Sequence, residues 1–141
     1  MGRRIGVIGT GKVAELHVRG YAATDAEVVA LCDVDAVVLG RRQNEWGIPT
    51  GHLSYEELLA DDSIEAVSVC TPNSTHHPIT LAAAAAGKHV LVEKPISMQL
   101  HEAQEMIDAC AAAGVVLQVG HHMRSWAAAS KAKQLIDAGA I

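Results

Sequence analysis

Short apolar runs alternate along the chain with longer stretches in which apolar residues recur at helical spacing. The runs typical of buried strands span residues 5–8, 28–32, 52–53, 64–70, 89–92 and 115–119. The stretches predicted to be helices span residues 13–23, 36–46, 55–60, 79–86, 100–113 and 127–138. Strands that alternate with helices favour a parallel sheet with helices on both faces. The pattern therefore predicts a doubly wound α/β fold with about six parallel strands, forming one domain over residues 1–141.

The first strand runs directly into a glycine-rich turn, Gly9-Thr10-Gly11-Lys12-Val13-Ala14. Gly9 permits a tight turn, and Gly11 lets a pyrophosphate approach the backbone. Ala14 lets the following helix pack close to the strand. The N-terminus of that helix offers N–H groups and the positive end of its dipole to phosphates. Residues 9–13 are therefore predicted to bind a dinucleotide, as in a Rossmann fold.

A carboxylate stands at the end of the second strand. Asp33 lies 24 residues after Gly9, where a carboxylate accepts hydrogen bonds from ribose hydroxyls. Asp33 also fits as the N-cap of the helix that begins near Asp35. Strand, glycine turn, helix, strand and acid in this order favour the ribose role.

The acid also favours NAD over NADP. A carboxylate repels a 2′-phosphate, and no arginine follows Asp33 at positions 34 or 35. Arg41 and Arg42 lie further along the next helix, and we expect both to be solvated. NAD is therefore the expected cofactor, and NADP is the less favoured alternative.

Polar loops follow three more strands, at residues 71–73, 93–95 and 120–124. The carboxyl ends of parallel strands meet at one edge of a sheet, which is where ligands bind in open α/β folds. Asn73 or the next residue, Ser74, is equally consistent with a simple helix cap. The convergence of five such loops predicts a binding site along this edge.

Composition excludes several classes of protein. Half of the 141 residues are hydrophobic and the net charge is −5, so neither disorder nor a nucleic-acid-binding surface is expected. No apolar run approaches the length of a membrane span. The three cysteines lie far apart, which indicates reduced, buried thiols and a cytoplasmic location. The histidine pairs at 76–77 and 121–122 are sequence neighbours, which rarely converge on one metal, so no metal site is expected.

These motifs resemble the glucose–fructose oxidoreductase / inositol dehydrogenase (Gfo/Idh/MocA) family. The resemblance rests on residues 9–11, 32–35, 70–76, 87–95, 120–122 and 135–139. Glu93-Lys94-Pro95, directly after a strand, is the most family-specific piece. The family implies an oxidoreductase that transfers a hydride between a nicotinamide cofactor and a hydroxyl-bearing carbon of a sugar, polyol or related compound.

The resemblance also assigns roles to residues. Lys94 is the implied catalytic residue, set near the nicotinamide and the reacting hydroxyl in a partly buried pocket, and the bond before Pro95 is a candidate for the cis form. The implied cofactor contacts beyond the glycine turn and Asp33 are Thr71, Pro72, Asn73, His76, Glu93, Lys94 and His122. Lys94, Met123 and Arg124 are the implied substrate contacts.

Such proteins usually carry a second α/β domain that binds substrate and often mediates oligomers. No such domain is present within residues 1–141, so we expect this chain to bind cofactor and to show little turnover by itself. A homo-oligomer is a further expectation. The alternative function is a sensor or regulatory protein that binds NAD(P) without catalysis, which the presence of Lys94 disfavours.

Overall fold

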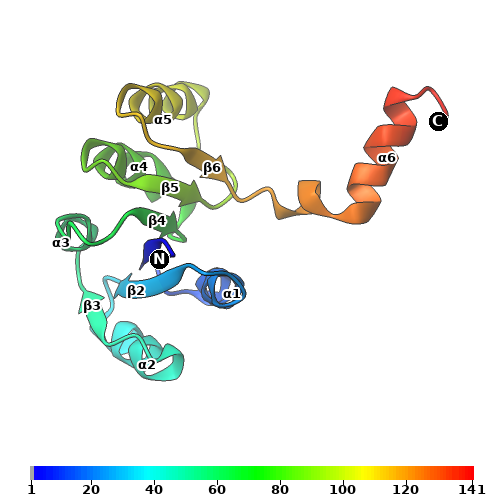
Figure 1. Ribbon diagram of the computed structural model, residues 1–141. Helices are drawn as coiled ribbons and strands as arrows, with labels where there is room; N and C mark the ends of the chain where they lie inside the picture. The colour runs from blue at the N-terminus through cyan, green and yellow to red at the C-terminus, as the bar shows by residue number, and fades with distance from the viewer. Residues whose placement is uncertain (1) are drawn as a thin grey trace.

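The computed structural model describes residues 2–141, in which strands and helices alternate (Figure 1). The strands are β1 (Arg4–Ile8), β2 (Glu27–Cys32), β3 (Thr50–His52), β4 (Ala66–Val69), β5 (His89–Val92) and β6 (Leu117–Val119). The α-helices are α1 (Lys12–Ala22), α2 (Ala36–Trp46), α3 (Tyr55–Leu59), α4 (His76–Ala85), α5 (Leu100–Ala112) and α6 (Ala127–Asp137). Two 3₁₀ turns, η1 (Asn73–Thr75) and η2 (His122–Ser125), follow β4 and β6.

The six strands form one sheet in the order β3-β2-β1-β4-β5-β6, and every neighbouring pair is parallel. The chain moves from β1 towards β3 and then crosses back to β4, so the strand order reverses between β1 and β4. In open α/β sheets, ligands bind at such a reversal, at the carboxyl ends of the strands. The predicted doubly wound fold is confirmed.

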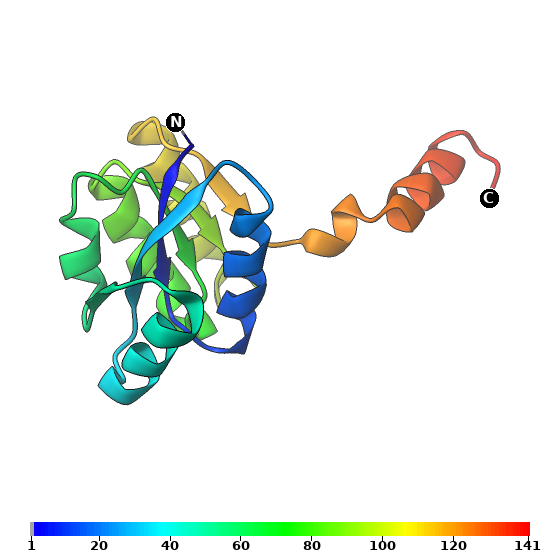
Figure 2. The same ribbon diagram turned by 60° about the horizontal axis from the view of Figure 1, so that its bottom comes forward.

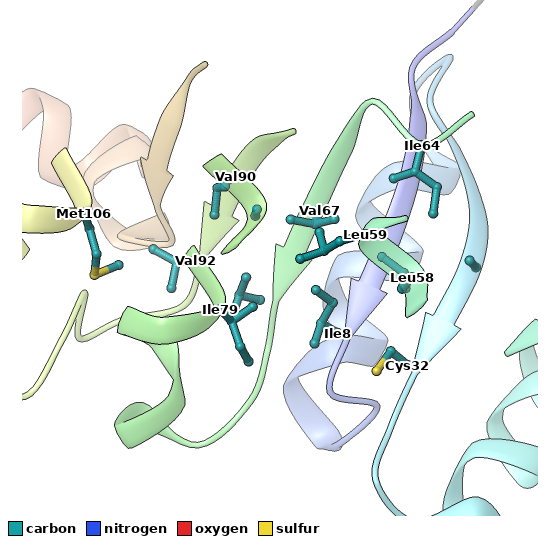
Figure 3. Packing of buried hydrophobic residues seen from close by; sticks show 13 residues of the cluster. Ile8, Cys32, Leu58, Leu59, Ile64, Val67, Ile79, Val90, Val92 and Met106 are labelled. Carbon is teal, nitrogen blue, oxygen red and sulfur yellow. The ribbon is translucent and has the colours of Figure 1, made fainter. Parts of the chain in front are cut away.

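Helices cover the two faces of the sheet with separate cores. Figure 3 shows the larger core, in which Leu58 of α3, Ile79 of α4 and Met106 of α5 pack on one face. On the other face Ala14 of α1 and Leu39 of α2 pack against the sheet in a second core. Burial of apolar side chains on both faces is what holds a parallel sheet together.

Some boundaries differ from the prediction. Helix α4 begins at His76 instead of residue 79, because Pro78 is tolerated in the first helical turn, where its missing N–H has no partner to lose. Strands β4 and β6 are shorter than predicted. The N–H of Ile64 donates to Asp61 O and that of Val115 to Cys110 O, so both residues belong to turns instead of ladders.

Helix α6 projects away from the sheet and the other helices in both views (Figures 1 and 2). Its residues are exposed apart from Leu135, which is partly buried. Across residues 2–141, every helix falls short of the length and apolar character that a bilayer-spanning segment needs.

We predict that Met106→Ala lowers the free energy of unfolding by about 2–5 kcal/mol, because it opens a cavity beneath α5 in the larger core. Met106 is fully buried, whereas the next residue, Ile107, is 48% exposed. Ile107→Ala is the matched control and should cost less than about 1 kcal/mol. Urea denaturation of both variants measures the difference, and equal losses would contradict this account of the core.

Candidate functional site

The loops that follow five strands lie side by side at one edge of the sheet. In each case the first residue after the strand donates its N–H to a carbonyl at the end of the neighbouring strand. The bonds run from Gly9 to Cys32 (2.8 Å), Asp33 to His52 (3.2 Å), Cys70 to Ile8 (2.7 Å), Glu93 to Val69 (3.0 Å) and Gly120 to Val92 (2.8 Å). The ladder therefore continues into the loops, and the predicted site residues are brought to one edge.

The two glycines of the turn after β1 have different environments. Gly9 has φ +85°, and a Cβ there would lie 2.8 Å from the carbonyl carbon and oxygen of Cys70. Gly11 is exposed and forms the N-cap of α1 with φ −67°. Among the described residues, none would come within 4 Å of a Cβ on Gly11, and none caps the helix with its side chain. Gly9 is thus required by packing, whereas Gly11 leaves an open approach to a helix N-terminus.

Asp33 fastens the glycine turn to the end of β2. Its Oδ2 accepts hydrogen bonds from Thr10 N (2.9 Å) and Thr10 Oγ1 (2.7 Å), and its Oδ1 accepts one from Asp35 N (3.1 Å). A carboxylate has about four acceptor positions, so this conformation leaves about one open, on Oδ1. Partial burial alone would raise the pKa of Asp33, but the hydrogen bonds from Thr10 and the following backbone lower it below its ordinary value. The carboxylate is therefore negatively charged at neutral pH.

The N-cap of α2 is Asp35, whose Oδ1 accepts from the N–H groups of Val37 (2.9 Å) and Val38 (3.1 Å). The capping alternative for Asp33 is therefore wrong. Val34 and Val37, which flank this cap, are almost fully exposed beside Asp33. The hydrogen bonds of Asp33 with Thr10 instead hold the turn after β1 in place.

The prediction that the side chain of Arg42 is solvated is wrong. Its Nε donates to Thr10 O (3.1 Å), one of its terminal nitrogens donates to Glu45 (2.7 Å), and the guanidinium lies 4.9 Å from the ring centroid of Trp46. The side chain is only 17% exposed. The sequence gives no sign of this contact, because it depends on the turn after β1 folding back over α2.

The loop after β4 carries Thr71, Pro72 and Asn73 into η1. Thr71 is partly buried, while Pro72 and Asn73 are exposed at the edge. The helix that follows is capped at Thr75, which makes no side-chain capping bond. The alternative that Asn73 or Ser74 only caps this helix is therefore not what the structure shows.

His76 is fully buried and joins two loops of the site. Its Nδ1 lies 2.8 Å from Pro95 O, and its Nε2 lies 3.0 Å from Thr71 O. Both partners are carbonyl oxygens, which only accept hydrogen bonds, so the ring tautomer decides which of them receives one. The side chain of His76 thus lies beneath the loops, and its contact with the cofactor stays a prediction.

Glu93, Lys94 and Pro95 form the turn after β5. The Lys94–Pro95 bond is cis, as anticipated. Glu93 is 9% exposed, and its Oε2 accepts a hydrogen bond from Lys94 N (3.1 Å). Lys94 itself is exposed.

Sequence reasoning missed a buried polar network that ends on Glu93. Tyr21 OH lies 2.8 Å from Ser68 Oγ, which lies 3.2 Å from His17 Nδ1, and His17 Nε2 lies 3.0 Å from Glu93 Oε1. Burial raises the pKa of the Tyr21 phenol, which therefore keeps its proton and can donate. His17 and Tyr21 stand four residues apart on α1, the spacing of one helix face, and this was the one signal available in the sequence.

His122, Met123 and Arg124 lie in η2 and are all exposed. The ring of His122 lies 6.1 Å from that of Trp126, centroid to centroid. A cavity of about 570 Å³ opens between α1 and the ends of β5 and β6, and it is lined in part by His17, Glu93, Lys94 and His122. The structure thus places Lys94 and His122 around one cavity, with Met123 and Arg124 next to it in the chain.

Residues 3–121 match the sequence pattern of the Gfo/Idh/MocA group, described as an oxidoreductase family with an NAD-binding Rossmann fold. The chain belongs to this family. The 1,5-anhydro-D-fructose reductase of Ensifer adhaerens is 42% identical over 139 residues, which are 98% of this chain and 42% of that protein. The D-xylose 1-dehydrogenase (NADP(+)) 2 of Haloferax volcanii is 35% identical, over 96% of this chain and 43% of its own length.

Solved structures of longer proteins share the fold. The WlbA dehydrogenase of Bordetella pertussis, crystallised with NADH and UDP-GlcNAcA, superposes with a TM-score of 0.93 and is 29% identical. The match covers 99% of this chain and 43% of that one. The chain therefore spans less than half the length of the relatives it matches, and the similarity includes the region of α6. Within residues 2–141 no cluster of three or more His, Cys, Asp or Glu side chains is arranged to hold a metal ion.

We predict that the two glycines of the turn separate stability from binding. Gly9→Ala places a side chain at positive φ against the backbone of Cys70 and should lower the free energy of unfolding by at least about 1–3 kcal/mol. Gly11→Ala meets open space at an ordinary φ, so it should unfold like the unmodified chain and yet bind NADH more weakly. Urea denaturation and NADH titration of both variants check this prediction. A Gly11→Ala chain with full NADH affinity would contradict the predicted role of Gly11 in phosphate binding.

Proposed function

We propose that this chain is the NAD-binding part of an oxidoreductase that transfers a hydride between the nicotinamide and a hydroxyl-bearing carbon of a sugar, polyol or related compound. The observation that carries the proposal is the pairing of Asp33 with Thr10 beside the open N-terminus of α1. The hydrogen bonds between Asp33 and Thr10 hold the glycine turn, the N-terminus of α1 and the carboxylate together. They do so next to β1 and β4, where the strand order reverses. Relatives of the chain are named as reductases and dehydrogenases of sugars, which supports the same chemistry.

The residues present fit a dinucleotide. Gly11 has no Cβ to fill the space in front of α1, and the N–H groups of the first turn of α1 are free of side-chain caps from residues 2–141. Such a helix end binds a pyrophosphate through its N–H groups and its dipole. The remaining acceptor position of Asp33 Oδ1 can take a hydrogen bond from a ribose hydroxyl. Thr71, Pro72 and Asn73 would line the path towards the nicotinamide half.

The charge at this end favours NAD. Asp33 carries a lowered pKa and therefore a full negative charge where a 2′-phosphate would have to lie. Arg42 does not offset it, because the guanidinium is held by Thr10 O and Glu45. Because a relative that is 35% identical is named for NADP(+), this preference is a property of these residues and not of the family.

Bound NAD supplies the hydride chemistry, and the chain supplies position and proton handling. We assign acid–base work at the reacting hydroxyl to Lys94, whose exposed ammonium stands at the cavity between α1 and β5–β6. Met123 and Arg124 are assigned to substrate contacts, with Arg124 offering a bidentate donor to a polar compound. The substrate-binding domain is assigned to residues outside 1–141, as is any contribution to a homo-oligomer.

The three cysteines support a reducing, cytoplasmic setting. Cys32, Cys70 and Cys110 are free thiols and all are buried. Burial raises the pKa of Cys70 to about 12, and the nearby charge of Glu93 adds to the effect. These thiols therefore serve packing and take no part in the proposed chemistry.

We predict that the chain binds NADH more tightly than NADPH by about tenfold or more, which corresponds to roughly 1.4 kcal/mol. The physical reason is repulsion between the Asp33 carboxylate and the 2′-phosphate. Fluorescence of Trp46 and Trp126, the two tryptophans, follows the titrations. Asp33→Asn should reduce this preference by removing the charge. Equal or tighter binding of NADPH by the unmodified chain would show that Asp33 has been misassigned.

We predict little or no turnover of sugars or polyols by the 141-residue chain alone, because Lys94 is exposed and the proposed substrate domain lies elsewhere. Following NADH absorbance with a panel of such compounds measures this directly. Robust turnover would overturn the division of labour proposed above. A complete protein whose Lys94→Ala variant kept its biological activity would favour the sensor alternative.

A further inference from the structure

Two buried histidines hold the turn that carries Lys94, and they do so from opposite faces of the sheet. His17 comes from α1, on the face covered by α1 and α2, and it contacts Glu93. His76 opens α4, on the face covered by α3, α4 and α5, and it contacts Pro95 O. The residue before Lys94 and the residue after it are therefore each bound by an imidazole.

The contacts on the α1 side form a directional chain in which every group is satisfied. When Tyr21 donates to Ser68 Oγ, Ser68 donates to His17 Nδ1, and His17 Nε2–H is left to donate to the Glu93 carboxylate. The other carboxylate oxygen of Glu93 accepts Lys94 N–H at 3.1 Å. The tautomer with its proton on Nε2 completes all four bonds. Because the chain begins with Tyr21 on α1 and Ser68 on β4, it holds the carboxylate to which the Lys94 backbone is bonded.

Gly120 restrains the same carboxylate from a third direction. A Cβ on Gly120 would lie 2.9 Å from Glu93 Oε1, which is closer than side chains tolerate. The loop after β6 can therefore pass this close to Glu93 only because residue 120 is a glycine. The side chains of His17 and Glu93 are only 9% and 11% exposed, so water does not compete freely for these bonds.

On the α4 side, His76 ties the Lys94 turn to the neighbouring loop. Its ring spans from Pro95 O to Thr71 O. Thr71 is the first of the residues in that loop assigned to the cofactor, so the turn and the loop are held at a fixed separation. A hydrocarbon side chain of similar size would fill the space and leave both carbonyls without this donor.

We propose that His17 and His76 are positioning residues, which set Lys94 against the nicotinamide half of the bound cofactor without touching the reaction themselves. This rests on the proposed function, because it requires the nicotinamide to lie at the Lys94 turn. The adenosine half is assigned to the glycine turn and Asp33, and the hydrogen bonds between Thr10 and Asp33 involve neither histidine. The two halves of the site should therefore respond separately to substitution.

The test compares NADH with ADP-ribose, which has the adenosine half and lacks the nicotinamide. His17→Leu and His76→Leu should each weaken NADH binding by about tenfold, the effect of losing one hydrogen bond. ADP-ribose binding should stay within about twofold, a difference well under one such bond. His17→Gln, which can still donate to Glu93, should recover part of the NADH affinity.

Two further variants keep the test sharp. His77→Gln is the matched control, because His77 adjoins His76 and pairs with exposed Glu105 at the surface; it should change neither affinity. Gly120→Ala leaves the core untouched and displaces the Glu93 carboxylate, so it should lower NADH affinity with ADP-ribose unaffected, even where a buried histidine variant fails to fold. Equal loss of both ligands, or no loss of either, would assign the histidines a merely structural role and overturn the inference.

The NMR resonance of the Lys94 backbone amide, measured without cofactor, distinguishes a failure of the positioning proposal from a failure of the proposed function. His17→Leu should shift it by breaking the bonded path through Glu93, while the amides of residues 9–11 stay in place. An unmodified chain that binds neither NADH nor ADP-ribose would overturn the proposed function, and the Lys94 shift would still report whether His17 positions the turn. An unchanged Lys94 resonance alongside normal NADH binding would overturn the positioning role alone.

Discussion

The site depends on how closely the backbone after β1 approaches the backbone after β4. Gly9 turns at positive φ with its α-carbon against the carbonyl of Cys70, at a distance that leaves no room for a Cβ. This contact brings the start of α1 beside the loop after β4 at the point where the strand order reverses. Asp33 then fixes the turn from the other side through Thr10. With a larger residue at position 9, the helix end, the carboxylate and the β4 loop could not share one edge.

Much of this arrangement could be predicted because it depends on short, local sequence motifs. Gly9, Gly11 and Asp33 follow their strands directly, and parallel pairing brings strand ends together regardless of detail. The sixth strand and the turn at Lys94 were predicted for the same reason. Boundaries were less accurate where a turn bond replaced a ladder bond, as at Ile64.

The contacts that sequence reasoning missed all join residues far apart in the chain. His17 meets Ser68 and Glu93 across 51 and 76 positions, and no local pattern marks such pairs. Arg42 looked like a solvated helix residue because its partner, Thr10, reaches it only after β1 and β2 have paired. The role of a buried polar residue follows from its hydrogen-bond partners, and the tertiary structure determines which groups those are.

The two halves of the edge are therefore built by different physics. Around Gly9 and Asp33 the chain uses backbone geometry and one carboxylate, and Arg42 of α2 reinforces the turn through Thr10 O. Around Lys94 it uses side chains from α1, β4 and α4 to hold a turn whose own residues are exposed. Backbone geometry is fixed by the fold, whereas a side-chain network can be altered one bond at a time with the sheet intact. Relatives of the chain are named for different sugars and for inositols. Under the proposed function the Lys94 half is the one next to the substrate, and it is also the half that this construction leaves adjustable.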